Sequence, residues 1–223
     1  MCRLFGIIGE FSSSYYLKEF RELALSGKGK KKKGHRHGWG IGYYLLKKAC
    51  VAKEPIDASK SEVLDFFCTK DLKTKILLSH LRLASQGEKI YENTHPFSKE
   101  NCIFSHNGSI LNFTSHGTDS ELFFLTILDN RIRTLKASIK KTILKIRRDF
   151  HFTSLNFILS DGKRLYAFRE FFENEDYYTL KYLDQPGHLA VCSESLGEEE
   201  WIDLENRELL VCDLRLKMKK YRI

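Results

Sequence analysis

The second residue of the chain could supply a complete nucleophile. If Met1 is removed, Cys2 carries both a thiol and a free α-amine. A thiol of pKa near 8.5 is only a few per cent ionised at neutral pH, and an α-amine of pKa about 7.7–8.0 can take its proton. Cys2 is also small enough for an aminopeptidase to cleave before it. The position therefore indicates nucleophilic catalysis with the base on the same residue, although a buried strand cysteine is the commoner role.

Three further clusters contain side chains that could bind or stabilise a substrate. Asn107 stands beside Gly108, and an amide side chain next to a glycine N–H is a workable oxyanion hole, although Asn-Gly is more often a simple turn. Arg82 follows an apolar run, and its planar guanidinium matches a carboxylate. Asp119 stands at a predicted helix start, where it could cap the helix or receive an ammonium group.

The elements that must position these residues alternate between helices and strands. Apolar residues at helical spacing predict helices over residues 15–26, 60–69, 118–129 and 134–148. The third of these opens with a Thr-x-x-Glu capping signature, formed by Thr118 and Glu121. Short apolar or alternating stretches predict strands at residues 2–8, 76–78, 102–105, 155–159, 164–168, 177–182, 188–192 and 208–214. No linker rich in Pro, Gly or Ser divides the chain, so we expect one domain over residues 1–223, of the α+β class with helices covering stacked sheets.

Composition narrows the kinds of protein that fit the chain. No apolar stretch approaches the roughly 18 residues of a membrane span, so we expect a soluble, cytoplasmic protein without a membrane partner. The six cysteines show no close-spaced pair typical of zinc or redox sites, which favours reduced thiols. The histidines lack metal-ligand spacing, so we expect them in loops and turns, with no metal and no cofactor. The net charge of +8 permits anionic partners but does not indicate a fold.

Taken together, these segments resemble the class II glutamine amidotransferases, which are N-terminal-nucleophile hydrolases. The resemblance is greatest to small stand-alone members, which begin Met-Cys-x-Leu-x-Gly and carry His-x-x-Gly-Trp-Gly, here residues 35–40. The other shared segments are Arg82-Leu83-Ala84-Ser85, Glu92-Asn93-Thr94-His95-Pro96-Phe97, His106-Asn107-Gly108, Thr118-Asp119-Ser120-Glu121, Ser193-Glu194-Ser195-Leu196 and Trp201-Ile202. Each is short, but chance would not produce all of them in this order.

The resemblance implies a four-layer αββα fold, with two stacked antiparallel sheets between helical layers. It also implies that Cys2 attacks the side-chain amide of glutamine, giving a thioester and ammonia. Asn107 and Gly108 would hold the oxyanion, Arg82 would bind the α-carboxylate, and Asp119 would bind the α-ammonium. By the same resemblance, His95 and Trp39 would shape or support the pocket, although core packing is the simpler role for both.

The chain departs from these relatives at two places. His37 stands where they typically carry an acidic residue, which puts an acidic role there in doubt. The loop at residues 28–33 is rich in lysine, and such a run is usually solvated rather than an anion or RNA contact.

Several functions remain open from the sequence. The length leaves no room for a synthase domain, so we expect a separate ammonia-accepting synthase subunit, or water, as the acceptor. The first hypothesis is a glutaminase-type amidohydrolase, and the second is a γ-glutamyl peptide hydrolase of the same fold. A third, from another class, is a non-catalytic anion- or RNA-binding module using the loop at residues 28–33. We expect nucleic acid not to be a partner.

Overall fold

Two stacked antiparallel sheets form the centre of the molecule. The computed structural model describes residues 2–28, 34–84, 88–114, 117–130 and 133–223. The first sheet contains, in spatial order, β11 (Ile202–Asp203), β9 (Lys181–Gln185), β10 (His188–Cys192), β1 (Arg3–Gly9), β4 (Ile76–Leu81), β2 (Trp39–Leu45) and β3 (Lys48–Glu54). The second contains β13 (Met218–Arg222), β12 (Glu208–Asp213), β8 (Arg164–Arg169), β7 (Asn156–Ser160), β6 (Cys102–Asn107) and β5 (Phe97–Lys99).

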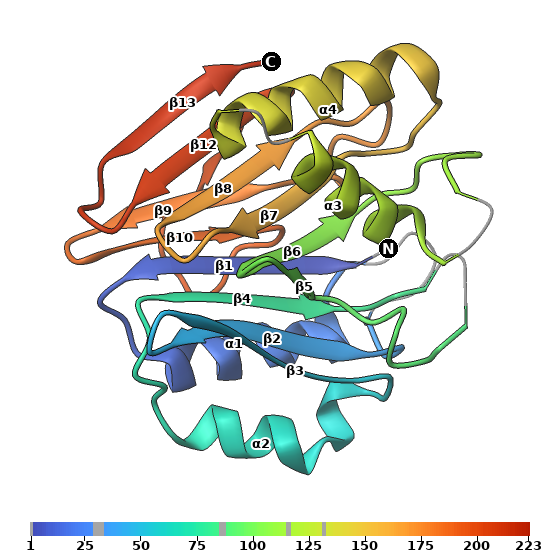
Figure 1. Ribbon diagram of the computed structural model, residues 1–223. Helices are drawn as coiled ribbons and strands as arrows, with labels where there is room; N and C mark the ends of the chain where they lie inside the picture. The colour runs from blue at the N-terminus through green and yellow to red at the C-terminus, as the bar shows by residue number, and fades with distance from the viewer. Residues whose placement is uncertain (1, 29–33, 85–87, 115–116, 131–132) are drawn as a thin grey trace.

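Helices cover the outer face of each sheet (Figure 1). The first sheet packs against α1 (Ser13–Ser26) and α2 (Glu62–Thr69), which follows the short 3-10 helix η1 (Ala58–Lys60). The second sheet packs against α3 (Asp119–Asp129) and α4 (Leu135–Asp149). The predicted four-layer αββα arrangement is therefore confirmed. None of the described helices has both the length and the apolarity needed to cross a membrane.

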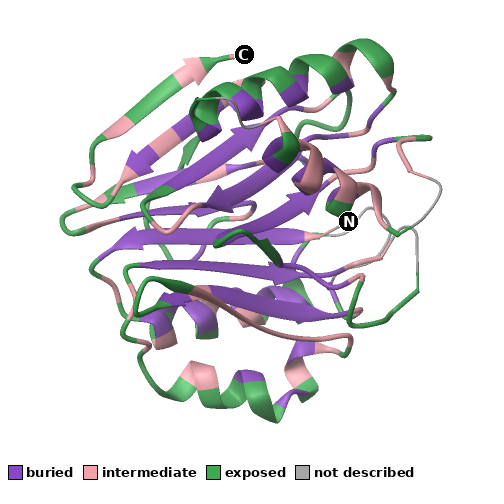
Figure 2. Ribbon diagram, in the orientation of Figure 1, coloured by how far each residue is buried: buried purple, intermediate pink, exposed green. Residues whose placement is uncertain are grey.

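The alternation of side chains in β1 shows how the layers are built. Leu4 and Ile8 enter the core between the two sheets, whereas Phe5 and Ile7 face α1. Because strand side chains alternate between faces, successive positions of β1 face different cores. Both faces are covered, so all seven residues of the strand are buried. Figure 2 shows that the central strands are buried along most of their length, whereas exposed residues lie on the outer faces of the helices.

Side-chain caps explain where several helices begin. Thr118 caps α3 by accepting the Glu121 N–H at 3.1 Å, as the capping signature predicts. The helix predicted over residues 60–69 is broken at Ser61, which caps α2 by accepting the Leu64 N–H. Thr134 caps α4, so the segment after α3 is a separate helix.

The strand boundaries are less accurate than the helix boundaries. The strand predicted at residues 177–182 begins only at Lys181, because Tyr177 packs under the Arg3 guanidinium, 5.2 Å from its ring centroid, instead of entering the ladder. The short strands β5 and β11 and the basic edge strand β13 carry no apolar run and were not predicted. Pairing with a neighbouring strand stabilises them.

Two glycines of β2 allow another chain segment to cross the sheet. Gly40 and Gly42 lie on the face between the sheets, since Trp39 and Ile41 enter the helix-side core. A side chain at Gly40 would overlap the His95 carbonyl oxygen, so the residue must be glycine for this approach.

We expect Gly40→Ala to destabilise the protein by about 1–3 kcal/mol, because the added methyl meets backbone that cannot rotate away. Gly42→Ala is the matched control, since its methyl would first meet the Ile103 side chain, which can change rotamer. Urea unfolding of both variants measures the difference. An equal or smaller loss for Gly40→Ala would contradict the packing described here.

Candidate active site

Residues from distant segments line one small cavity where β1 begins and β6 ends. They include Cys2, Arg82, His95, Gly108 and Asp119. Cys2 directly precedes β1, which begins at Arg3. The cavity holds about 50 Å³, below the roughly 300 Å³ at which ligand pockets begin.

The thiol of Cys2 is protonated at neutral pH. Its Sγ lies 4.0 Å from the Leu83 carbonyl oxygen. Part of the residue is exposed, but the thiol itself is surrounded by protein, and burial raises its pKa. The Leu83 contact and the charges of Arg82 and Arg3 oppose this shift without reversing it. A nucleophile in this state needs a base at the moment of attack.

Buried polar contacts hold the start of β1 in place. The Arg3 Nε donates to Glu194 Oε2 at 2.8 Å, and the same guanidinium contacts the Lys28 carbonyl oxygen. The Ser193 hydroxyl accepts the Leu4 N–H at 2.9 Å. These contacts position the residue that precedes Arg3. Sequence reasoning assigned no role to Arg3, Ser193 or Glu194, although the shared Ser-Glu-Ser-Leu segment pointed to two of them.

The proposed oxyanion-hole residues sit at the end of β6. Asn107 shares the inter-sheet face of β6 with Ile103 and is buried, and neither atom of its amide group has a hydrogen-bond partner within the described chain. Leaving such a group unsatisfied costs about 1–3 kcal/mol. Asn107 does not itself line the cavity, but its neighbours His106 and Gly108 do. Gly108 lines the cavity, and any side chain there would overlap the Ser154 carbonyl oxygen.

Opposite charges face the cavity from two other segments. Arg82 is buried, which lowers its pKa, while Cys2 acts in the opposite direction. One of its nitrogens donates to the Glu88 carbonyl oxygen at 2.8 Å. Asp119 accepts the N–H groups of Ile110 at 2.7 Å and Ser120 at 2.9 Å. Thr118 caps the helix, so Asp119 is not the cap, and its carboxylate retains lone pairs for another donor.

Two buried histidines stack beside this cavity. The rings of His80 and His95 lie 4.3 Å apart between their centroids, at an interplanar angle of 28°. Burial lowers both pKa values well below the usual range, and Arg82 adds to the effect on His80. No ring nitrogen of the pair makes a hydrogen bond of normal geometry to a described residue, although the backbone of His106 is near enough to raise the pKa of His80 slightly. Both rings are therefore neutral at pH 7.

Two other histidines serve as hydrogen-bonding links. His106 joins Ser120, at 2.9 Å from Nδ1, to the Ser154 carbonyl oxygen, at 3.2 Å from Nε2, so Nε2 carries the proton. His37 Nδ1 accepts the Ala84 N–H at 3.1 Å. The His37 imidazole thus accepts a backbone N–H from the segment that follows Arg82.

The histidines differ from expectation in their location. His80 lies in β4 and His106 in β6, both buried, so the expectation of loop and turn positions was wrong for these two. Strands are recognised in a sequence by their apolar residues. A polar side chain that a strand buries against a second sheet is therefore assigned to a loop or turn. Within the described ranges, no group of three or more His, Cys, Asp or Glu side chains is placed to hold a metal ion.

Trp39 is not brought to the cavity. Its ring lies in the helix-side core of the first sheet, 1% exposed, and its Nε1 donates to Glu54 Oε2 at 3.0 Å. Its contribution is to packing on the opposite face of the sheet. In the lysine-rich loop only Lys28 is described, and residues 29–33 lie outside the described residues.

A protein-family match and a named relative both indicate a glutamine amidotransferase. The family described as "Glutamine amidotransferases class-II" matches residues 1–191. An uncharacterised protein of Methanocaldococcus jannaschii is 27% identical over 95% of this chain and 69% of its own length. A relative in Escherichia coli, provisionally named as a glutamine amidotransferase, is 29% identical over 75% of this chain and 72% of its own.

Solved structures share the fold at low sequence identity. A glutamine aminotransferase class-II domain protein from Silicibacter pomeroyi has a TM-score of 0.73 and 19% identity, covering 100% of this chain and 99% of that chain. An allosteric regulatory enzyme of purine biosynthesis has a TM-score of 0.75 and 19% identity, covering 99% of this chain and 49% of its own.

Proposed function

Because the chain belongs to the class II glutamine amidotransferases, we propose that Cys2, freed by removal of Met1, attacks the side-chain amide of glutamine. The observation that carries this proposal is the shared cavity, where a thiol, a glycine beside an unpartnered asparagine amide, and two opposite charges meet. We propose that residues 1–223 act as one amidotransferase domain. We place the reaction in the cytoplasm, whose reducing conditions keep a cysteine thiol free.

In the first step the Cys2 sulfur forms a bond to the amide carbon, and the thiol proton passes to the α-amine of the same residue. The Asn107 side-chain amide and the Gly108 N–H stabilise the negative charge that develops on the amide oxygen. The α-amine then gives its proton to the departing nitrogen as the carbon–nitrogen bond breaks. Ammonia leaves and a thioester remains, which water hydrolyses to glutamate. No cofactor takes part in these steps.

The substrate is selected by its α-carboxylate and α-ammonium groups. Arg82 presents a guanidinium to the α-carboxylate, and Asp119 presents a carboxylate to the α-ammonium. Arg82 and Asp119 contact only the α-carboxylate and α-ammonium of the γ-glutamyl group. They do not contact the group attached to the amide nitrogen. A γ-glutamyl peptide is therefore the alternative substrate, releasing an amine in place of ammonia. With glutamine, the ammonia acceptor would be a separate synthase subunit, or water would complete a glutaminase reaction.

The test combines labelling with turnover. Intact mass would be measured before and after exposure to a glutamine-like diazo-ketone, and release of ammonia from glutamine would be compared with release of amine from γ-glutamyl peptides. We expect loss of Met1, one adduct at Cys2, and turnover of at least one substrate class. Retained Met1 with no adduct would refute the mechanism. It would favour a non-catalytic module, in which neutralising residues 30–33 abolishes anion or RNA binding.

We expect Arg82→Lys to raise KM for the preferred substrate about tenfold or more with a smaller change in kcat, because lysine is a point donor and not a planar fork. Steady-state kinetics on protein with a native N-terminus measures both constants. Lys53→Arg, in β3 of the same sheet and outside the cavity lining, is the charge-preserving control. An unchanged KM in Arg82→Lys would remove Arg82 from substrate binding.

A further inference from the structure

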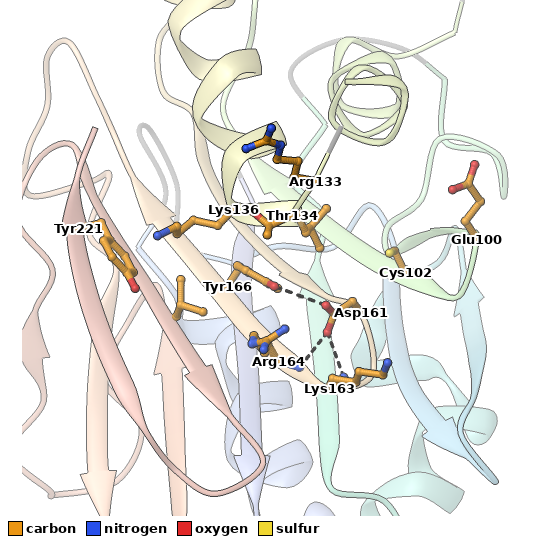
Figure 3. A pocket seen from close by; sticks show the side chains of 12 residues that line it. Glu100, Cys102, Arg133, Thr134, Lys136, Asp161, Lys163, Arg164, Tyr166 and Tyr221 are labelled. Atoms are coloured by element: carbon orange, nitrogen blue, oxygen red, sulfur yellow. Dashed lines mark hydrogen bonds between the residues drawn. The ribbon is translucent and has the colours of Figure 1, made fainter. Parts of the chain in front are cut away.

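A second and larger cavity opens on the outer face of the second sheet, beside the start of α4 (Figure 3). It holds about 520 Å³, within the roughly 300–1,000 Å³ of small-molecule sites. Its floor is made by Tyr166 of β8, Val211 of β12 and Tyr221 of β13, and the walls by the start of α4 and the turn between β7 and β8.

Positive side chains line this cavity. Arg133 and Lys136 approach from the start of α4, and Lys163 from the turn. None of these three forms an ion pair with a described carboxylate. The Lys136 ammonium is held 4.0 Å from the centroid of the Tyr221 ring, which places its charge over the floor.

The negative charges nearby are largely engaged. Asp161 accepts the N–H groups of Lys163 at 3.0 Å and Arg164 at 2.8 Å, and its other oxygen accepts the Tyr166 hydroxyl at 3.3 Å. Asp161 thereby stabilises the turn between β7 and β8. Tyr166, and more weakly Asp161, raise the pKa of Arg164, which keeps its guanidinium charged. Glu100 is the other carboxylate in the lining.

The helix that forms one wall adds to the positive potential. The first turn of α4 contains no acidic residue, and its Thr134 cap uses the Ala137 N–H. The free N–H groups and the dipole at the start of a 15-residue helix favour an anion. Lys219 lies on the same face of β13 as Tyr221, since side chains alternate between faces.

We propose that this cavity binds a nucleoside diphosphate, or a phosphorylated compound of the same kind. Ammonium, guanidinium and helix N–H groups suit phosphate oxygens, and the floor of two tyrosines and a valine suits a flat ring. The site is distinct from the Cys2 cavity. Cys102 at one end of β6 lines it, whereas Asn107 ends the same strand, about 17 Å away at ~3.4 Å per residue.

The experiment is calorimetric titration of the full chain with ADP at fixed ionic strength. The cavity variant is the double substitution Arg133→Gln with Lys163→Gln. The control is Lys140→Gln with Lys141→Gln, which removes the same charge from exposed positions of α4 outside the lining. We expect the cavity variant to bind ADP at least about tenfold more weakly and the control within about twofold of the unmodified chain. Thermal unfolding checks that both variants fold.

Other outcomes would overturn the proposal. They are no ADP binding at millimolar concentration, equal weakening in both variants, or tighter binding of single-stranded RNA that both variants weaken equally. Loss of ADP binding after the diazo-ketone has modified Cys2 would assign the ligand to the catalytic cavity. Because ADP is tested apart from turnover, failure here leaves the proposed amidotransferase reaction unaffected.

Discussion

Replacing Cys2 by alanine is expected to lower kcat for glutamine or γ-glutamyl hydrolysis by about 10⁴-fold or more, because the nucleophile is removed. Alanine is also small, so removal of Met1 is expected to proceed as before. The stability of the fold should change little, since part of Cys2 is exposed and its thiol makes only a long contact with Leu83. Initial-rate assays and urea unfolding on the same preparation measure both effects.

Cys50→Ala is the matched control, since Cys50 is also a partly exposed free thiol but lies in β3, outside the cavity lining. It should retain full activity and still be alkylated at Cys2. Activity that survives in Cys2→Ala would show that another group performs the chemistry.

An uncleaved extension before Cys2 tests which group is the base. An acylated nitrogen cannot accept the thiol proton, so the extended protein should be inactive although its thiol is intact. His95 is the other candidate base, because it lines the same cavity as a neutral ring. Full activity in the extended protein would favour His95.

Acidification below about pH 6.5 is expected to destabilise the fold steeply. His80 and His95 have folded-state pKa values well below their usual value because they are buried, so in this range the unfolded chain binds more protons than the folded one. The free energy of unfolding therefore decreases as the pH falls below about 6.5. Each such histidine contributes up to ~1.4 kcal/mol per pH unit, or ~2.7 kcal/mol for the pair.

Urea unfolding at several pH values between 7 and 4.5 measures this slope. His95→Gln should reduce the slope by up to ~1.4 kcal/mol per pH unit, because an amide does not titrate. His151→Gln, at an exposed position, is the matched control for loss of a histidine. A slope in His95→Gln equal to that of the unmodified chain would show that the buried pair does not control the acid response.

Much of the architecture could be predicted because it depends on local signals. Thr118 and Glu121 mark the start of α3, and the apolar run at residues 76–78 marks β4. The ordered motifs indicated the αββα fold and pointed to Cys2 and Gly108, which the structure places on one cavity. Short edge strands such as β13 were missed because pairing with β12, and not their own apolar residues, stabilises them.

Sequence alone indicated the family, the Thr118 cap and the residue types available for amide chemistry, because each motif is formed by residues close together in the chain. Tertiary structure decided which faces meet. The stacking of two sheets buries His80 against His95, which are 15 positions apart, and turns Trp39 to the opposite face of its sheet. Likewise, Arg133 and Lys163 converge with Tyr221 only because α4 begins over the edge of the second sheet. Periodicity specifies the face of an element on which a residue lies, but the packing of distant elements specifies what that face contacts.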